Sequence, residues 1–238
     1  MEQAEFDRFA DKYHAQHREA VQITGEEPEY FAEYKIRVLA NIAATDGIDA
    51  RRVIDFGAGI GNSIPHFRKF LPGAQLTCAD VSRRSLDLAE SRFAGMANTV
   101  LIEGERIPSE NGSFDLAFSA CVFHHIDHDE HVHWLRELGR ITRPGGLLAI
   151  FEHNPLNPLT VRAVNNCPFD ENARLIRSGQ LAHRLQLAGW TRPQVRYHVF
   201  FPRALAVLRP LERALTNVPF GAQYFIAASK LAKPTWRH

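Results

Sequence analysis

Three glycines alternate directly after a short apolar segment, and this pattern restricts the fold more than any other feature of the chain. Residues 53–56 read Val-Ile-Asp-Phe, and Gly57, Gly59 and Gly61 follow them. Glycine permits backbone conformations with positive φ and lets a ligand approach where a Cβ atom would intrude. A strand that passes through such a loop into a helix is typical of a sheet with a nucleotide-binding crevice at its carboxyl edge. We therefore predict an α/β fold that binds a ligand at this loop.

Beyond the loop, segments typical of strands alternate with segments typical of helices. Strands are predicted at 53–56, 75–79, 99–102, 114–119, 147–152, 194–200 and 222–229. Helices are predicted at 62–70, 83–93, 129–141 and 179–188. The alternation predicts βαβ units, and the last strand should be antiparallel because no full crossover helix precedes it. We therefore expect a Rossmann-like α/β fold with a seven-stranded, mainly parallel sheet and an antiparallel last strand.

Three stretches do not follow this alternation and are expected as additions to one core. Helical patterns at 5–20 and 28–44 predict an N-terminal helical lid, and prolines and asparagines interrupt the rhythm after residue 152. A helix between prolines is expected within 201–220. The predicted organisation is one domain, 1–238, with a helical lid at 1–45, a cofactor-binding core at 50–152, and substrate-cap insertions at 153–177 and 201–220.

Charge and cysteine content restrict the function and the compartment. The formal net charge of +1 gives no electrostatic argument for nucleic acid as a partner. Cys78, Cys121 and Cys167 form no CxxC pair, which fits a reducing compartment better than a disulfide scaffold. The acidic N-terminus lacks the apolar run of a signal peptide, and no stretch of about 18 apolar residues could span a bilayer. We expect a cytoplasmic protein without an integral membrane segment.

Residues around the glycine loop narrow the class of ligand. Asp80 follows the second predicted strand, where a carboxylate can accept hydrogen bonds from ribose hydroxyls. A dinucleotide fingerprint would place a glycine at position 62, which is Asn62 here. Asp55 before the loop suits a cofactor that carries an amino acid, because an ammonium group needs an acceptor. A tight turn without a ligand is the simpler alternative.

Several segments, in order along the chain, resemble motifs of the class I S-adenosylmethionine-dependent methyltransferases. They are Asp55-Phe56-Gly57-Ala58-Gly59-Ile60-Gly61, Ala79-Asp80-Val81-Ser82, Gly104-Glu105-Arg106-Ile107-Pro108, and the segments 113–117, 123–126 and 138–146. The resemblance covers about residues 50–152 and is closest to the small-molecule branch of the family. It implies S-adenosyl-L-methionine as the cofactor and methyl transfer as the reaction.

The resemblance also implies roles for individual residues. Asp55 would contact the ammonium group of the cofactor, and Asp80 the ribose hydroxyls. Glu105, where the family more often has aspartate, would face the adenine amino group, with Arg106 offering a backbone N–H. The other cofactor-binding positions implied are Gly57, Ala58, Gly59, Gly61, Val81, Ala120 and Cys121.

The N-terminal segment resembles the lid helix of the same branch. Its Tyr13 would touch the cofactor, and Lys35 on the next predicted helix would pair with the cofactor's carboxylate. Such a lid would exclude water from the reaction. Core packing for the aromatic residues and an exposed position for Lys35 are the alternatives.

Candidates for catalysis follow the fourth and fifth predicted strands. His124 and His125 come after one strand, and Glu152 and His153 end the other, so all four should meet at the same edge of the sheet. Methyl transfer from a sulfonium requires alignment and exclusion of water, and a general base assists only some acceptors. We interpret the two adjacent histidines as catalytic or as structural, and Glu152 as substrate-orienting or as a support for the proline-rich loop. His153 is the candidate base.

Clustered histidines raise the alternative of a metal site. His124, His125, His128, His131 and His133 lie within ten residues. A zinc site requires three or four converging ligands, and the last three histidines are expected on or before an exposed helix. We therefore predict no metal.

The acceptor is predicted from the two caps, which are rich in phenylalanine and leucine. We expect methyl transfer to an O or N atom of a small apolar, aromatic or lipid-linked metabolite, with carbon acceptors left open. A leucine stripe with helical spacing is expected to pack internally or to form a homodimer face; it comprises Leu205, Leu208, Leu211 and Leu215. The rival functions are a nicotinamide-dependent oxidoreductase and a non-catalytic, cofactor-binding regulatory subunit.

Overall fold

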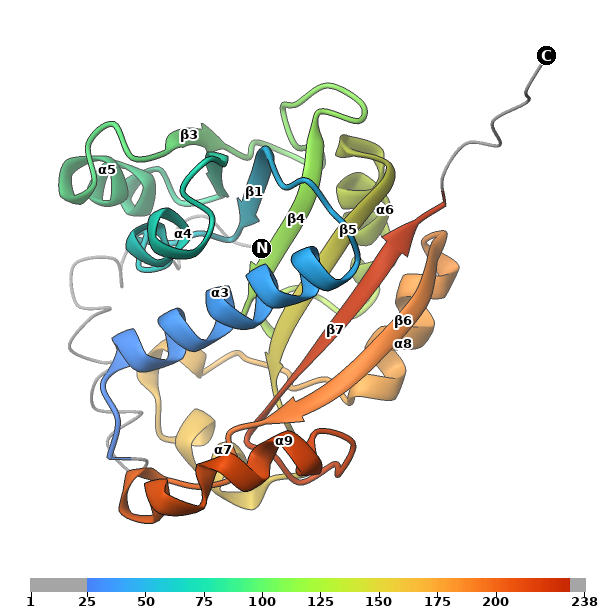
Figure 1. The fold of residues 1–238 in the computed structure, drawn as a ribbon. Helices are drawn as coiled ribbons and strands as arrows, with labels where there is room; N and C mark the ends of the chain where they lie inside the picture. The colour runs from blue at the N-terminus through green and yellow to red at the C-terminus, as the bar shows by residue number, and fades with distance from the viewer. Residues whose placement is uncertain (1–24, 232–238) are drawn as a thin grey trace.

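A twisted seven-stranded sheet forms the centre of the molecule in the computed structural model, which describes residues 25–231 (Figure 1). The strands are β1 (Arg52–Phe56), β2 (Gln75–Asp80), β3 (Asn98–Leu101), β4 (Phe114–Ala120), β5 (Thr142–His153), β6 (Trp190–His198) and β7 (Gln223–Lys230). Their order in the sheet is β3-β2-β1-β4-β5-β7-β6. β1 to β5 pair in parallel, whereas β7 is antiparallel to both β5 and β6. The predicted sheet with its antiparallel last strand is confirmed.

Helices cover both faces of this sheet. The α-helices are α3 (Pro28–Thr45), α4 (Ile64–Phe70), α5 (Arg83–Arg92), α6 (His131–Ile141), α7 (Pro158–Asn165), α8 (Ser178–Leu187) and α9 (Glu212–Leu215). The 3₁₀ turns are η2 (Phe123–His125), η3 (Pro168–Asp170) and η4 (Arg203–Leu211). One buried apolar cluster joins α3, α4 and α5 to the sheet, and another joins α6 and α8 to the opposite face. Both clusters bury apolar side chains of the same strands, which explains why these strands are almost entirely apolar.

The helix predicted at 28–44 forms as α3, but it is a layer of the core. Pro28 opens the helix, as proline does at a first helical position. Ile36 and Leu39 are fully buried, and they belong to the apolar cluster that includes β1, β4 and β5. The part of the predicted lid before residue 25 lies outside the described residues. Because α3 packs across the sheet, its first turns stay next to the carboxyl edge, where the strands of the core end.

The leucine stripe at 201–220 does not form the single helix that its spacing predicts. The chain makes the 3₁₀ turns of η4, with non-helical backbone at Leu205, and then the short α9. Pro210 lies inside η4 and cannot donate a backbone hydrogen bond, which disfavours a continuous α-helix. Leu205 and Leu211 are exposed rather than packed internally. Figure 1 shows α9 at the end of the sheet where β5 ends and β7 begins.

The strand β5 begins earlier than the sequence indicates. Residues 143–146, which precede the strand predicted at 147–152, are already part of β5, and β5 pairs with β4 through a bulge between Phe114 and Leu116. A bulge lets one strand keep its pairing while the other carries extra residues.

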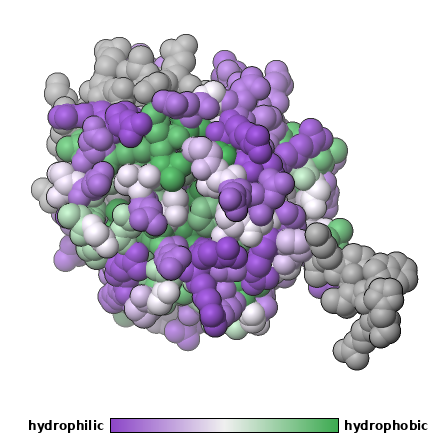
Figure 2. Space-filling model, turned by 90° about the horizontal axis from the view of Figure 1, so that it is seen from above, coloured by the Kyte–Doolittle hydropathy of each residue, from purple (hydrophilic) through white to green (hydrophobic). Residues whose placement is uncertain are grey.

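The face of the molecule seen in Figure 2 is largely polar. Figure 2 shows mostly hydrophilic residues on the face seen from above, with hydrophobic residues between them. Within residues 25–231, no helix is both long and apolar enough to cross a membrane. Most of the large apolar side chains are buried in the two clusters on the faces of the sheet.

Candidate active site

A cavity of about 300 Å³ lies at the carboxyl edge of the sheet, between the glycine loop and the caps. One end is lined by the loop and by the last residues of β1 and β2, and the other by α7 and the turns η2 and η3. Its volume falls at the lower end of the range for small-molecule sites. The predicted site residues that line it are Lys35, Asp55, Gly57, Ala58, Gly59, Asp80, Val81, Ala120, Cys121, His124, His125 and His153.

The three glycines of the loop differ in what a side chain at each position would meet. A Cβ atom on Gly57 would lie 2.3 Å from Cγ2 of Val122, so packing against the chain itself requires glycine there. A Cβ atom on Gly61 would meet Ile64 at 2.7 Å, where α4 begins. A Cβ atom on Gly59 meets no described atom within 4 Å. Gly59 therefore borders open space in the cavity, whereas Gly57 and Gly61 hold the loop against the core.

Asp80 fixes the loop and still faces the cavity. Its carboxylate accepts hydrogen bonds from the backbone N–H of Gly59 at 2.8 Å and of Ser82 at 2.9 Å. The two oxygens thus hold the loop and the turn after β2, and Asp80 also lines the cavity. The contact of Asp80 with the ribose hydroxyls of a ligand bound on the loop stays a prediction.

Asp55 is a buried acceptor at the same end of the cavity. Its Oδ2 atom makes no hydrogen bond with the described residues, which is costly for a buried oxygen. Burial, together with the nearby charge of Asp80, raises the pKa of the Asp55 carboxyl to about 7. A cationic ligand group would remove both penalties at once. This orphaned oxygen is the strongest sign of a ligand with a positive charge.

Cys121 adopts an uncommon backbone conformation at the end of β4. Its φ is 59°, a left-handed value that a non-glycine residue rarely takes and that is often found at functional sites. The buried Lys35 donates a hydrogen bond from Nζ to its Sγ atom at 3.2 Å. Burial acts to raise the pKa of the Cys121 thiol, but the charges of Lys35 and His153 outweigh it and lower the pKa to about 6. Lys35 thus lines the cavity and is not a solvated side chain, while its contact with the cofactor's carboxylate stays a prediction.

Glu152 lies behind η2 and does not belong to the cavity lining among the described residues. Its Oε1 atom accepts the backbone N–H groups of Val122 and Phe123, and its Oε2 atom lies 2.6 Å from Nδ1 of His124. Glu152 therefore makes no direct contact with the cavity that would support the predicted catalytic role. The carboxylate instead orients His124 and the backbone after β4.

The histidines of η2 meet a carboxylate from the cap. Nε2 of His124 lies 3.5 Å from Oδ1 of Asp170, and Nε2 of His125 lies 3.3 Å from the same oxygen. Burial acts to lower the pKa of His124, but the neighbouring carboxylates of Glu152 and Asp170 outweigh it and raise the pKa to about 10. Burial, aided by the neighbouring His124, lowers the pKa of His125. The two adjacent imidazoles therefore differ in their preferred charge.

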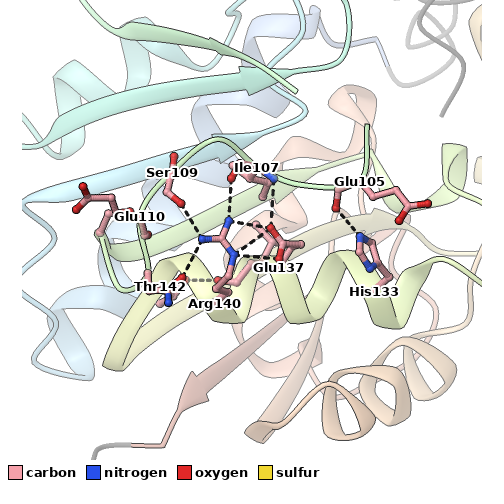
Figure 3. A network of polar contacts seen from close by, with 11 residues as sticks. Glu105, Ile107, Ser109, Glu110, His133, Glu137, Arg140 and Thr142 are labelled. Atoms are coloured by element: carbon pink, nitrogen blue, oxygen red, sulfur yellow. Dashed lines mark hydrogen bonds and ion pairs between the residues drawn. The ribbon is translucent and has the colours of Figure 1, made fainter. Parts of the chain in front are cut away.

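Neither Glu105 nor Arg106 belongs to the described cavity lining. Figure 3 shows this segment held against α6. The Arg140 guanidinium donates to the carbonyl groups of Ile107 and Ser109 at 2.8 and 2.7 Å, and Nε2 of His133 lies 2.6 Å from the carbonyl oxygen of Glu105. The adenine role of Glu105 therefore stays a prediction. Tyr13, the remaining predicted contact, lies outside the described residues.

Sequence reasoning missed Asp170 and Cys167, which both line the cavity. They lie in and just before η3, in the cap without a readable motif. The backbone N–H of Arg174 donates to the His124 carbonyl at 2.7 Å and ties this cap to η2. A single aspartate in a loop carries no spacing signal, so only the folded chain identifies it.

The residues around the loop fit S-adenosylmethionine. Asp55 offers an unsatisfied acceptor for its ammonium group, Asp80 offers acceptors for its ribose hydroxyls, and Lys35 offers a donor for its carboxylate. Open space over Gly59 leaves room for the body of the cofactor. Asn62 also lines this end, where its Oδ1 atom accepts a hydrogen bond from Arg92 at 3.0 Å.

Comparison with known proteins gives the same class. A family model described as a methyltransferase domain matches residues 54–150. The chain is 30% identical over 172 residues to a demethylmenaquinone methyltransferase of Streptomyces griseus, covering 63% of this chain and 73% of that protein. It is also 30% identical over 140 residues to the ribosomal RNA small subunit methyltransferase C of Pseudomonas entomophila, covering 56% and 42% of the two.

A solved structure resembles nearly the whole chain. It is a SAM-dependent methyltransferase of Thermotoga maritima, described as a possible histamine N-methyltransferase. The match has a TM-score of 0.66 and 18% sequence identity, and it covers 96% of this chain and 99% of that one. The chain spans less than half the length of several curated relatives that it matches. The fold, the glycine loop and these matches together show that the chain belongs to the class I S-adenosylmethionine-dependent methyltransferases.

Proposed function

We propose that this protein transfers the methyl group of S-adenosylmethionine to an O or N atom of a small apolar, aromatic or lipid-linked metabolite. One observation carries the proposal: a single cavity joins the cofactor end, with Asp55, Gly59 and Asp80, to an end lined by apolar side chains and imidazoles. The apolar side chains of the cavity lining include Phe31, Leu159, Val164, Val199 and Phe200.

Bound at the loop, the cofactor supplies an electrophilic methyl group for in-line displacement. The protein's contribution is to bind, to align and to exclude water. Asp55, Asp80 and Lys35 bind one end, and the caps with α7 enclose the acceptor. This division of roles agrees with the apolar walls around the second end of the cavity.

His153 is the candidate base for an acceptor that carries a proton. It lines the cavity, and the thiolate-stabilising contact with Cys121 raises its pKa against the lowering effect of burial. A base in this position would contribute about 10²–10⁴-fold to turnover. We therefore expect His153→Ala to lower kcat by about 100-fold or more, with KM for the cofactor nearly unchanged. Unchanged turnover on the true substrate would exclude the role.

A carbon atom of a quinol ring is a second candidate acceptor. The similarity to the demethylmenaquinone methyltransferase of Streptomyces griseus favours it, and an apolar cavity suits a ring with a lipid tail. Deprotonation of a ring hydroxyl would activate the neighbouring carbon, so His153 would serve as the base for this acceptor too. The similarity to an rRNA methyltransferase covers 42% of that protein, and the net charge of +1 gives it no electrostatic support.

The test is incubation of host extract with the full chain and methyl-labelled cofactor, followed by mass spectrometry of the products. A labelled small molecule would support the proposal, and its fragmentation would assign O, N or C. A labelled RNA alone would overturn it. Tight cofactor binding without any labelled product would favour a regulatory subunit, and preference for a nicotinamide dinucleotide in a binding assay would favour an oxidoreductase.

We further propose that the protein acts in the cytoplasm. Cys78, Cys121 and Cys167 form no disulfide among the described residues, which fits a reducing compartment. The exposed leucines of η4 are the candidate homodimer face, and light scattering during size-exclusion chromatography would measure the mass in solution.

A further inference from the structure

Three side chains at the acceptor end of the cavity direct ligand atoms to one point. They are Nε2 of His124, Nε2 of His125 and the carboxylate of Asp170, and all three atoms lie within 4.8 Å of one another. The histidines come from η2, directly after β4, and Asp170 comes from η3 in the cap. The residues are far apart in the sequence, so the cluster exists only in the folded chain.

The separations match those of a metal centre. Two ligands at about 2.0–2.1 Å from a tetrahedral zinc ion lie about 3.3–3.4 Å apart. The Asp170 oxygen is 3.5 Å from Nε2 of His124 and 3.3 Å from Nε2 of His125. Two imidazoles and one carboxylate, with one position left for a small molecule, are the protein ligands typical of catalytic zinc sites.

Groups behind the cluster have the arrangement that supports metal ligands. The side chain of His124 is 1% exposed, and its Nε2 makes no hydrogen bond with the described residues. Its other ring nitrogen lies 2.6 Å from the Glu152 carboxylate, whose second oxygen accepts two backbone N–H groups. A carboxylate bound to Nδ1 fixes the tautomer that presents Nε2 to a metal, and it makes the imidazole a stronger ligand.

We propose that His124, His125 and Asp170 bind one divalent transition-metal ion, for which Zn²⁺ fits the ligands and their spacing best. All three residues line the cavity, so the remaining coordination position faces the acceptor. An acceptor oxygen bound there would be polarised and held in register with the methyl group. That use of the metal rests on the proposed function, whereas metal binding itself does not.

The alternative is a set of ion pairs without metal. A protonated His124 between Glu152 and Asp170 would also satisfy both carboxylates. Under this alternative the cluster stabilises the cap, and added zinc has no effect on it. Measurement of binding distinguishes the two.

The experiment uses the full chain, stripped with a chelator and titrated with Zn²⁺ by calorimetry, and with Co²⁺ by visible absorption. We expect one equivalent of Zn²⁺ and the intense d–d bands of four-coordinate cobalt. X-ray absorption of the zinc-loaded wild type should then show only N and O ligands, including imidazole. Absence of stoichiometric zinc binding by the wild type, or a spectrum without imidazole, would overturn the proposal.

Variants with matched controls locate the site. Asp170→Asn and His125→Gln should each weaken zinc binding by more than the about 10–100-fold that loss of an outer partner costs. The exposed Asp129→Asn and His183→Gln should bind zinc as the wild type does. Full zinc affinity in both cluster variants would refute the assignment. Circular dichroism checks the fold of each variant, and the absorption data on the wild type remain decisive if one fails to fold.

Glu152→Gln tests the supporting contact. The amide keeps one acceptor for the backbone N–H groups but presents NH₂ to Nδ1 of His124, which then favours the tautomer with a proton on Nε2. Zinc affinity should fall about 10–100-fold with the fold retained. Methyl transfer in the same samples separates this proposal from the proposed function: zinc binding without transfer would refute only the function, and transfer with no zinc binding only the metal site.

Discussion

The two ends of the cavity are built in different ways. At the cofactor end, Asp55, Gly59 and Asp80 lie within one βαβ unit, and backbone groups hold the Asp80 carboxylate. At the acceptor end, side chains from η2, β5 and η3 hold one another. The first end is therefore set by local turns. The second depends on segments that are distant in the sequence.

A side chain at Gly57 should break the cofactor end most severely. Its φ is 76° and its Cβ would overlap Val122, so Gly57→Ala should lower the free energy of unfolding by about 2–4 kcal/mol. Gly59→Ala has a positive φ but no overlap, and should cost only about 1 kcal/mol. Urea denaturation measures both. The additional change Val122→Ala should restore part of the loss, and equal stability of the two glycine variants would contradict the steric explanation.

Removal of the Asp80 carboxylate should have the next largest effect, on cofactor binding. Asp80→Ala deletes the acceptor for two backbone N–H groups and for the ribose, so affinity for S-adenosylmethionine should fall by about 30-fold or more. Calorimetric titration measures the affinity. Asp87→Ala on the exposed side of α5 is the control and should bind normally. A loss below about threefold for Asp80→Ala would show that the ribose binds elsewhere.

Asp55 should make both stability and cofactor affinity depend on pH. Its pKa in the folded protein, about 7, is higher than the ordinary value, so the folded state keeps a proton that the unfolded chain loses at lower pH. The stability of the cofactor-free protein should therefore fall as the pH rises from about 4 to about 7. Cofactor affinity should rise through the same pKa, because the charged carboxylate accepts the ammonium group.

Asp55→Asn separates these two effects. Without the buried charge, the cofactor-free protein should be more stable than the wild type at about pH 8, by roughly 1–3 kcal/mol. Its cofactor affinity should be lower and should lose the rise near neutral pH. Thermal unfolding and calorimetry across the pH range test both. A variant less stable than the wild type at high pH would mean that Asp55 already has a partner.

The smallest effect is expected for Glu105. Its side chain is exposed, and the segment around it is held by backbone contacts with α6. Glu105→Ala should change cofactor affinity by less than about 0.5 kcal/mol, within the usual range for an exposed residue. A loss above about tenfold, or 1.4 kcal/mol, would instead support the adenine contact that the family motif implies.

Most of the fold could be predicted because it depends on local patterns. Apolar segments of strand length, helical spacing and the glycine loop each lie within a few residues, and the sheet has the predicted topology. The main error lies in a segment where the local pattern favoured a structure that does not form. The stripe at 205–215 has helical spacing, but Pro210 disfavours a continuous helix and several of its leucines face outward.

In the site, too, local patterns predicted some positions correctly and failed for others. Asp55, Gly59 and Asp80 are adjacent to strand ends, so their convergence follows from parallel pairing of β1 and β2. Glu152 also ends a strand, but its contacts turn it behind η2 rather than into the cavity. Asp80 and Glu152 both end strands at the carboxyl edge of the sheet, but only Asp80 lines the cavity. The difference lies in the direction of each side chain, which local sequence does not determine.

The alternation of strand and helix patterns determined the parallel α/β core, because strand, turn and helix are short-range choices. The glycine loop, Asp55 and Asp80 narrowed the class of ligand, and the resemblance of these and later segments to methyltransferase motifs gave the cofactor and the reaction class. Only the tertiary structure decided that Asp170 meets His124 and His125. That contact joins η2 to a cap more than 40 residues later, through the backbone bond between Arg174 and His124. Long-range packing places such groups, and sequence spacing carries no record of it.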